Sequence, residues 1–269
     1  MTIPFEPYLF RIPLNIQVIA ECLAFSVGFR YYVASRKYQD GDVSGNFRQP
    51  IIWGAILGTF LGARIMGFME NPYGIHQLRQ VLIQFNARSI MGGLFGAMIG
   101  VKVVRRLLNE QNLSFDLFTL PLVLSIFIGR IGCFLNGTKD FTYGTETDFF
   151  MAMDLGDGLY RHPIALYELI FLAFLFISLH RNRLALQQFP DLMFTIFMMS
   201  YFGFRFCIEY LKPNVFFLYS LSSVQWLCIG CCVYFLPALS RSLKLVFGKI
   251  PMPGLATQVT VLDEESISV

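Results

Sequence analysis

Residues 125–137 read Ser-Ile-Phe-Ile-Gly-Arg-Ile-Gly-Cys-Phe-Leu-Asn-Gly and close an apolar run that begins near Leu117. Arg130 lies inside this run, between Gly129 and Gly132. An arginine inside a membrane helix costs several kcal/mol unless it meets an anion, a carboxylate or water. The neighbouring glycines allow another backbone or a ligand to come close. Arg130 is therefore either a binding residue or a structural arginine that snorkels to the helix end, about 7 Å away at ~1.5 Å per residue.

The composition is that of a helical membrane protein. Of the 269 residues, 55% are hydrophobic and 14% are charged, and the mean hydropathy is +0.56. These values lie outside the range of a soluble domain and are typical of a polytopic membrane protein. The net charge of +3 is spread over the loops, and we expect no nucleic-acid partner.

The six cysteines give no disulfide framework, because all of them fall in apolar runs, where cysteine packs as a small hydrophobic residue. Cys228, Cys231 and Cys232 are spaced like a soft-metal site, but no histidine or carboxylate lies near them in the sequence. We therefore expect core packing there, and neither a metal nor a cofactor. In the same way, residues 154–158 resemble a turn rather than a calcium loop, since the EF-hand spacing is absent.

We expect an all-α polytopic membrane protein with seven transmembrane helices in one domain, residues 1–250. The apolar runs lie near residues 14–34, 51–69, 89–104, 117–135, 163–180, 191–211 and 216–238, and several approach the ~20 residues that cross a bilayer. The third run is short and rich in glycine, which favours a tightly packed inner helix. The longest loop is residues 136–162, and residues 251–269 are expected to form a disordered cytoplasmic tail.

The basic residues predict the orientation of these helices. Eleven of them follow spans one, three and five or lie in the tail: Arg36, Lys37, Arg48, Lys102, Arg105, Arg106, Arg181, Arg183, Arg241, Lys244 and Lys249. Six lie on the opposite side: Arg11, Arg79, Arg88, Lys139, Arg161 and Lys212. The positive-inside rule then places the N-terminus outside and the C-terminus in the cytoplasm.

With this orientation, the polar residues of the membrane helices fall at a common depth, in their outer halves. The set comprises Glu21, Arg64, Gly92, Gly93, Arg130, His162, Tyr167, Glu168, Arg205, Glu209 and Gln225. Arg205 and Glu209 are four residues apart and share one face of their helix. The common depth predicts one polar cavity that opens toward the outer leaflet.

Two interpretations of this set remain open. It could be a group of buried ion pairs, such as Arg205 with Glu209, and Arg64 or Arg130 with Glu21 or Glu168. However, three arginines and three glutamates at one depth exceed what packing requires, and charged residues inside a membrane usually serve function. Because the planar guanidinium group binds phosphate oxygens bidentately, the arginines indicate an anionic phospholipid as ligand.

Three motifs stand out: Gly-Arg-Ile-Gly-Cys-Phe-Leu-Asn-Gly (residues 129–137), Arg-His-Pro-Ile-Ala-Leu-Tyr-Glu (residues 161–168) and Arg-Phe-Cys-Ile-Glu-Tyr (residues 205–210). Together they resemble the bacterial prolipoprotein diacylglyceryl transferase family. Gly-Ala-Arg at residues 62–64 and Met-Gly-Gly-Leu at residues 91–94 fit the second and third spans of that family. The similarity covers nearly the whole chain in the same order.

The resemblance implies an enzyme of the bacterial inner membrane. Such an enzyme transfers diacylglycerol from phosphatidylglycerol to the thiol of a lipobox cysteine in a secreted prolipoprotein, and glycerol phosphate leaves. The resemblance also implies that Arg130 and Arg205 hold the phosphate and stabilise the leaving group. It assigns the shape of the pocket to His162, Tyr167, Glu168, Glu209 and Asn136, and it implies no cofactor.

The chain departs from the family pattern at several positions. Met91 replaces the usual histidine of the third span, and Cys133 replaces an asparagine. Thr138 stands where an acidic residue is expected, Lys212 stands in place of an arginine, and Ala-Glu-Cys at residues 20–22 replaces an aromatic-rich segment. The sequence therefore indicates a divergent branch that keeps the phosphate-binding arginines and lacks the imidazole.

Attack by a thiol requires a base, because a free thiol with a pKa of about 8.5 is mostly protonated at neutral pH. Without the histidine, the candidates are Glu21, Glu209 and His162. We favour Glu21, since a carboxylate buried in apolar surroundings would be the stronger base, although it could equally pair with an arginine. His162 could simply mark the helix entry before Pro163, and Cys133 is interpreted as a packing residue rather than a nucleophile.

A second class of function remains possible, a non-catalytic phospholipid-binding or transport protein that keeps the phosphate site without the base. A transporter would be expected to show repeats or broken helices in both halves. The sequence shows neither, which favours the transferase.

Overall fold

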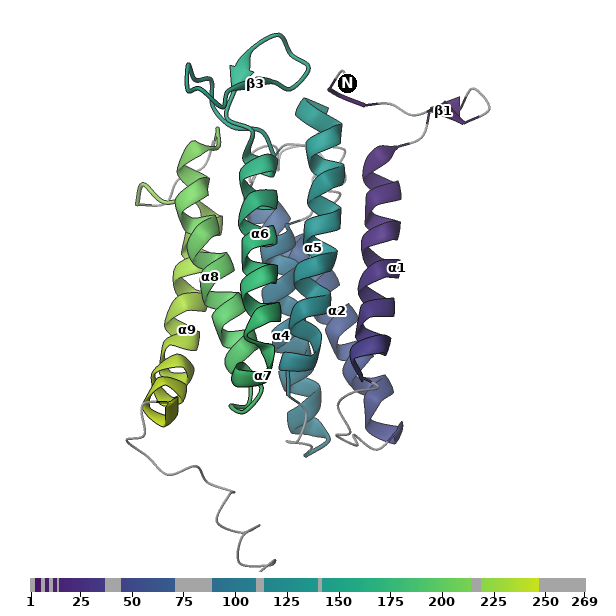
Figure 1. Cartoon of the computed structure of the whole chain (residues 1–269), viewed down its shortest axis with the longest axis vertical. Coiled ribbons are helices and arrows are strands. Elements are labelled where there is room, and N and C mark those ends of the chain that lie inside the picture. Colours follow the sequence, from purple (N-terminus) through teal and green to yellow (C-terminus); the bar gives the residue numbers. More distant parts are fainter. Residues whose placement is uncertain are drawn as a thin grey trace, which may run out of the picture.

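The computed structural model describes residues 3–5, 8–9, 12–13, 15–36, 45–70, 89–109, 114–139, 142–213 and 219–246. Its long helices are α1 (Ile16–Arg36), α2 (Gly45–Glu70), α4 (Ile90–Leu107), α5 (Asp116–Asn136), α6 (Ile164–Arg181), α8 (Leu192–Ile208) and α9 (Ser223–Val246). The short elements are β1 (Tyr8–Leu9), β2 (Ile12–Pro13), η1 (Gly137–Lys139), β3 (Met153–Asp154), β4 (Tyr160–Arg161), α7 (Arg183–Leu186) and η2 (Glu209–Leu211). The long helices stand side by side in one bundle, with β3 at one end (Figure 1).

Six of the described helices are long and apolar enough to cross a membrane, which agrees with the predicted all-α polytopic fold. They are α1, α2, α5, α6, α8 and α9. The remaining long helix, α4, carries Lys102, Arg105 and Arg106 within its 18 residues. Many large apolar side chains of the bundle point outward, for example Phe25 and Phe174, which are 76% and 70% exposed. A lipid environment explains such a surface.

The boundaries predicted for the last span were wrong. Helix α9 begins at Ser223 and ends at Val246, instead of running from 216 to 238. Tyr219 and Ser220 have positive φ angles of 51° and 62°, which a helix does not accept. The start is then fixed by Ser222, whose hydroxyl oxygen accepts from the backbone N–H of Gln225 while the Gln225 side chain accepts from the Ser222 N–H. This reciprocal pair is a capping box.

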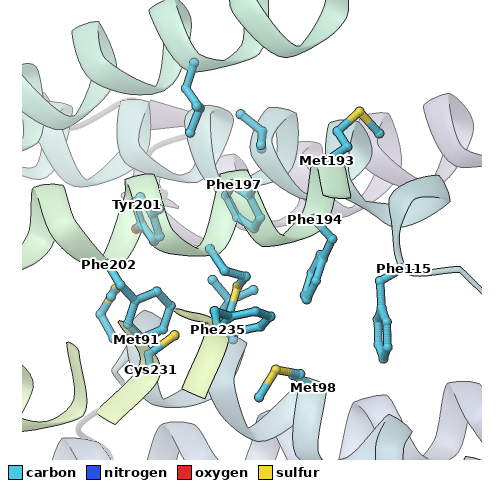
Figure 2. Packing of buried hydrophobic residues seen from close by; sticks show 14 of the residues in the cluster. Met91, Met98, Phe115, Met193, Phe194, Phe197, Tyr201, Phe202, Cys231 and Phe235 are labelled. Carbon is cyan, nitrogen blue, oxygen red and sulfur yellow. The ribbon is translucent and has the colours of Figure 1, made fainter. Parts of the chain in front are cut away.

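The apolar core of the bundle is centred on α8, which packs mainly against α9. Phe197, Tyr201 and Phe202 of α8 are fully buried, and Figure 2 shows them along one helix with Met91, Cys231 and Phe235 nearby. Cys228 and Cys231 belong to this core, which confirms the packing interpretation.

Helices α2 and α4 form the most extensive contact of the bundle, through glycines spaced four residues apart. The facing pairs are Gly54 with Gly100, Gly58 with Gly96, and Gly62 with Gly92. A Cβ atom at any of these positions would overlap the backbone or a side chain of the opposite helix. The contact confirms that the glycine-rich third run is a tightly packed helix, and it follows the small-residue rule for membrane helices.

Helices α5 and α8 cap each other where they begin. One carboxylate oxygen of Asp116 accepts a hydrogen bond of 2.8 Å from the N–H of Phe194. In return, Asp191 accepts one of 2.7 Å from the N–H of Phe115. Because each carboxylate satisfies an N–H at the N-terminal end of the other helix, the two helices are joined at this end.

We call the opposite end, where α5 ends and α6 begins, the hairpin end (upper in Figure 1). Strands β3 and β4 pair there, and the turn between them is closed by Asp154, which accepts from the N–H groups of Gly156 and Gly158. This confirms the predicted turn. The guanidinium group of Arg161 lies 2.7 Å from Asp157 and lowers the pKa of that carboxyl group by hydrogen bonding.

Some predicted features lie outside the described residues. These are the tail 251–269 and the loop residues Arg11, Lys37, Arg79, Arg88 and Lys249, which contributed to the orientation.

Candidate active site

The candidate active site is built on Glu168 of α6, whose carboxylate is shared by two arginines. Its Oε1 lies 2.8 Å from Nε of Arg130 on α5, and its Oε2 lies 3.2 Å from Nη1 of Arg205 on α8. All three side chains are buried, and that of Glu168 is 0% exposed. Three helices thus bring together three residues that are far apart in the sequence, as their common depth predicted.

The ion pairs continue along the end of α8. Arg205 contacts Glu209 one turn later at 3.3 Å, and Glu209 contacts Lys212 at 3.8 Å. The short helix η2 follows α8 directly and keeps Glu209 buried. The predicted pairs Arg205–Glu209 and Arg130–Glu168 are therefore both present.

These five side chains, which we call the charge cluster, contain three cations and two carboxylates. Buried charges are tolerated when they are paired and hydrogen-bonded. Two of the cations in the cluster are guanidinium groups, which can bind oxyanions through several N–H donors.

Tyr201 is a member of the site that the sequence analysis missed. Its hydroxyl group donates a hydrogen bond of 2.5 Å to Oε1 of Glu168. Tyr201 precedes Arg205 by four residues, as Arg205 precedes Glu209, so the three lie on one face of α8. This spacing could have indicated its role, but a tyrosine in an apolar run is more simply interpreted as core.

The thiol of Cys133 links the charge cluster to α1. Its sulfur lies 3.7 Å from Nη1 of Arg130 and 3.5 Å from Nε2 of Gln17, and Gln17 Nε2 lies 3.4 Å from Oε1 of Glu21. Gly132 permits this approach, because a Cβ there would overlap Ala20 and press on Gln17. Gly132 therefore admits a neighbouring helix, as predicted, whereas no neighbouring atom lies within 4 Å of a Cβ placed on Gly129.

The expected burial of Glu21 was wrong. Its side chain is exposed on α1. The buried face of α1 consists of Ala20, Ala24 and Gly28, which are four residues apart. Glu21 follows Ala20 in the helix and therefore lies off this buried face. Its connection with the cluster runs through Gln17 and Cys133.

His162 and Tyr167 form a separate polar pair at the hairpin end. Nδ1 of His162 lies 3.2 Å from the hydroxyl group of Tyr167, and both side chains are half-buried. Tyr167 directly precedes Glu168 in the sequence of α6, so the pair is adjacent in sequence to a member of the charge cluster. An imidazole in contact with a phenol can hold or transfer a proton.

The other predicted site residues serve visible structural contacts. Gly92 and Gly93 pack against α2, and the Arg64 guanidinium lies 5.3 Å from the centre of the Phe60 ring. Asn136 ends α5 before Gly137, which has a φ of 59°. Gln225 caps α9 and also donates to the carbonyl oxygen of Phe206 at 3.4 Å.

Met91 is 1% exposed and belongs to the apolar core, at the start of α4 (Figure 2). Among the described residues, no group of three or more His, Cys, Asp or Glu side chains could hold a metal ion. The side chains described at this site carry guanidinium, ammonium, carboxylate, imidazole, phenol and thiol groups.

Fold and site together define a multi-pass helical membrane protein with a buried arginine–glutamate cluster at one end of its bundle. The chain belongs to the prolipoprotein diacylglyceryl transferase family, whose model matches residues 7–240.

Curated relatives support this membership. A phosphatidylglycerol–prolipoprotein diacylglyceryl transferase of Ehrlichia canis is 31% identical over 220 residues, which cover 77% of this chain and 82% of the relative. The protein of the same name from Bordetella bronchiseptica is 32% identical over 247 residues, covering 83% and 90%. That of Pseudoalteromonas translucida is 26% identical over 221 residues, covering 77% and 80%.

Proposed function

We propose that this protein transfers a diacylglyceryl group from phosphatidylglycerol to the cysteine thiol of a prolipoprotein. The family, the names of the relatives and the charge cluster support this function. The observation that carries most weight is the pair Arg130 and Arg205, which are held by one carboxylate at 2.8 and 3.2 Å.

In this proposal the two arginines bind the lipid phosphate. A phosphodiester carries one negative charge, which two guanidinium groups can bind through several N–H donors. When the thiolate attacks the diacylglycerol carbon, the C–O bond to the phosphate breaks and the departing glycerol phosphate gains a second negative charge. Arg130 and Arg205 would stabilise that developing charge, as preorganised donors do in a buried site. Glu168 and Tyr201 would keep the guanidinium groups in place.

The base would be Glu21 or His162. Glu168 and Glu209 each neutralise two cations, so protonating either would leave buried positive charge without its counterion. Glu21 stays the first candidate, because Gln17 and Cys133 connect it with Arg130. His162, paired with Tyr167, is the alternative.

We further propose seven transmembrane helices, with α4 as the third, in one domain that spans residues 1–250 of a bacterial inner-membrane protein. The N-terminus and the hairpin end would face outward and the C-terminus the cytoplasm, because the basic residues concentrate at the opposite end of the helices. The charge cluster would then lie in the outer half of the membrane, where a secreted prolipoprotein could reach it.

Two experiments test the function. The gene is expressed in a strain depleted of its own prolipoprotein diacylglyceryl transferase, and the purified protein is given labelled phosphatidylglycerol and a prolipoprotein peptide with one cysteine. Growth and label on the peptide are expected. Intact, folded protein that neither restores growth nor labels the peptide would contradict the proposal.

One observation favours a second candidate, a non-catalytic phospholipid-binding protein. Met91, which cannot accept a proton, is buried in the apolar core where the family resemblance leads one to expect histidine. Such a protein would bind phosphatidylglycerol without labelling the peptide.

A further inference from the structure

A pocket adjoins the charge cluster at the hairpin end. It is shallow and partly open to solvent, with an enclosed volume of about 10 Å³, the space of about one water molecule, and is lined largely by apolar groups that include Phe134, Leu155, Pro163 and Ala165. Cys133 lines the same pocket and lies 3.7 Å from Arg130. The pocket is thus separated from the candidate phosphate site by one residue.

Four large apolar side chains are exposed on the segment that surrounds this pocket, and we call them the hairpin surface: Phe149, Phe150, Leu159 and Tyr160. Phe150 is 84% exposed, and its ring lies 4.4 Å from that of Phe149, which lies 5.9 Å from the His162 ring. Lipid tails explain exposed apolar groups on the helices, but this segment lies beyond the helix ends (Figure 1). Exposed apolar groups in such a place indicate a binding surface.

The charge of this segment indicates that the hairpin surface binds a polypeptide rather than a bilayer surface. Residues 136–162 contain five acidic and two basic residues, a net charge of −3, whereas the whole chain has +3. Anionic lipid headgroups repel an acidic segment, while aromatic side chains with acidic neighbours suit an apolar polypeptide of neutral or basic character.

The surface is held in place by backbone hydrogen bonds. The N–H of Gly144 donates to the carbonyl oxygen of His162 at 3.0 Å, and that of His162 donates to Thr145 at 3.1 Å. The N–H of Thr145 donates to Leu211 at 2.8 Å, which connects the segment with the end of α8. A preorganised surface loses less entropy when it binds a partner.

Resting on the proposed function, we propose that the hairpin surface binds the acceptor polypeptide. The residues that flank the reacting cysteine lie on Phe149, Phe150 and Tyr160, beside the shallow pocket. This position brings the acceptor thiol past Cys133 toward Arg130, where the lipid phosphate binds. Recognition of the acceptor therefore depends on residues separate from those that hold the lipid.

Crosslinking tests the binding without requiring turnover. A benzophenone amino acid is placed at position 150 of the full chain in phosphatidylcholine nanodiscs, with a biotinylated prolipoprotein peptide added. The matched control carries the same group at Tyr219, which is 86% exposed in the connection between α8 and α9. Peptide crosslinks at 150 that excess unlabelled peptide removes, and few at 219, are expected. Crosslinks to lipid alone, or equal yields at both positions, would overturn the proposal.

Kinetics separate this inference from the proposed function. In a wild-type protein that labels the peptide, Phe150→Ala together with Tyr160→Ala is expected to raise KM for the peptide about tenfold, with KM for phosphatidylglycerol unchanged. Tyr219→Ala should change neither. Unchanged peptide KM in the folded double variant, with active wild type, would refute the binding surface and leave the transferase intact.

Discussion

Tyr201 donates its hydroxyl hydrogen to Oε1 of Glu168 over 2.5 Å, and the same oxygen contacts Arg130. The phenol thus helps to fix the carboxylate that holds both arginines. Tyr201→Phe keeps the ring in the core and removes only the hydroxyl group. We expect it to lower the free energy of unfolding by about 1–3 kcal/mol, as for other buried hydrogen bonds to charged groups, and to reduce transfer at least tenfold. Tyr234→Phe, whose hydroxyl contacts Lys102 at the other end of the bundle, is the control. Equal activity in both variants would contradict this role of Tyr201.

The two buried arginines should not tolerate lysine. Arg130→Lys and Arg205→Lys keep the charge but replace the planar fork with one ammonium group, so bidentate contact with phosphate is lost. We expect transfer to fall about 100-fold or more in each, as when a preorganised donor is removed from a catalytic site. Arg181→Lys, at an exposed position near the opposite end, should be neutral. Full transfer by folded Arg130→Lys would remove the main support for a phosphate site.

The sequence predicted the members of the charge cluster better than it predicted the neighbouring residues Tyr201 and Glu21. Arg130, Glu168, Arg205 and Glu209 could be found because charged residues are rare in apolar runs, and their common depth follows from helix length and orientation alone. Tyr201 could not be separated from the core, since its ring packs with Phe197 and Phe202. The exposure of Glu21 depends on which face of α1 meets α5, and the weak amphipathicity of a membrane helix says little about that. The small residues Ala20, Ala24 and Gly28 would have been the better guide.

The contact between α2 and α4 should be sensitive to a single methyl group. A Cβ at Gly58 would overlap the carbonyl oxygen of Gly96, so Gly58→Ala forces the two helices apart. We expect a loss of about 1–3 kcal/mol in stability, typical of an overpacked interface. Gly230→Ala is the matched control, because no neighbouring atom lies within 4 Å of its added Cβ. Thermal unfolding in detergent measures both. A melting temperature that is unchanged in Gly58→Ala would show that the interface is looser than described.

The proposed orientation can be checked with reporter fusions. Fusions after Lys37, Arg106 and Arg183 should report a cytoplasmic location, and one after Asp148 in the hairpin segment a location outside. The reason is the concentration of basic residues at the end of the bundle opposite the charge cluster. The fusion after Arg106 also tests whether α4 crosses the membrane despite its three basic residues. An outward signal from any of the first three would rule out the proposed topology.

The last prediction concerns the base. Glu21→Gln keeps the shape of the side chain and removes its ability to accept a proton, so it should lower kcat by about 10²–10⁴, the range of general base catalysis, with little change in phosphatidylglycerol binding. Glu146→Gln, an exposed carboxylate paired with Arg161, should leave kcat unchanged. Met91→His should not be required for activity and should reduce stability, because it places a polar ring where Met91 is 1% exposed.

All variants are compared by labelling a prolipoprotein peptide from phosphatidylglycerol. Activity only in Met91→His would identify the natural protein as a catalytically inactive relative. Undiminished turnover in Glu21→Gln would assign the proton to His162, and His162→Gln would then have to abolish it.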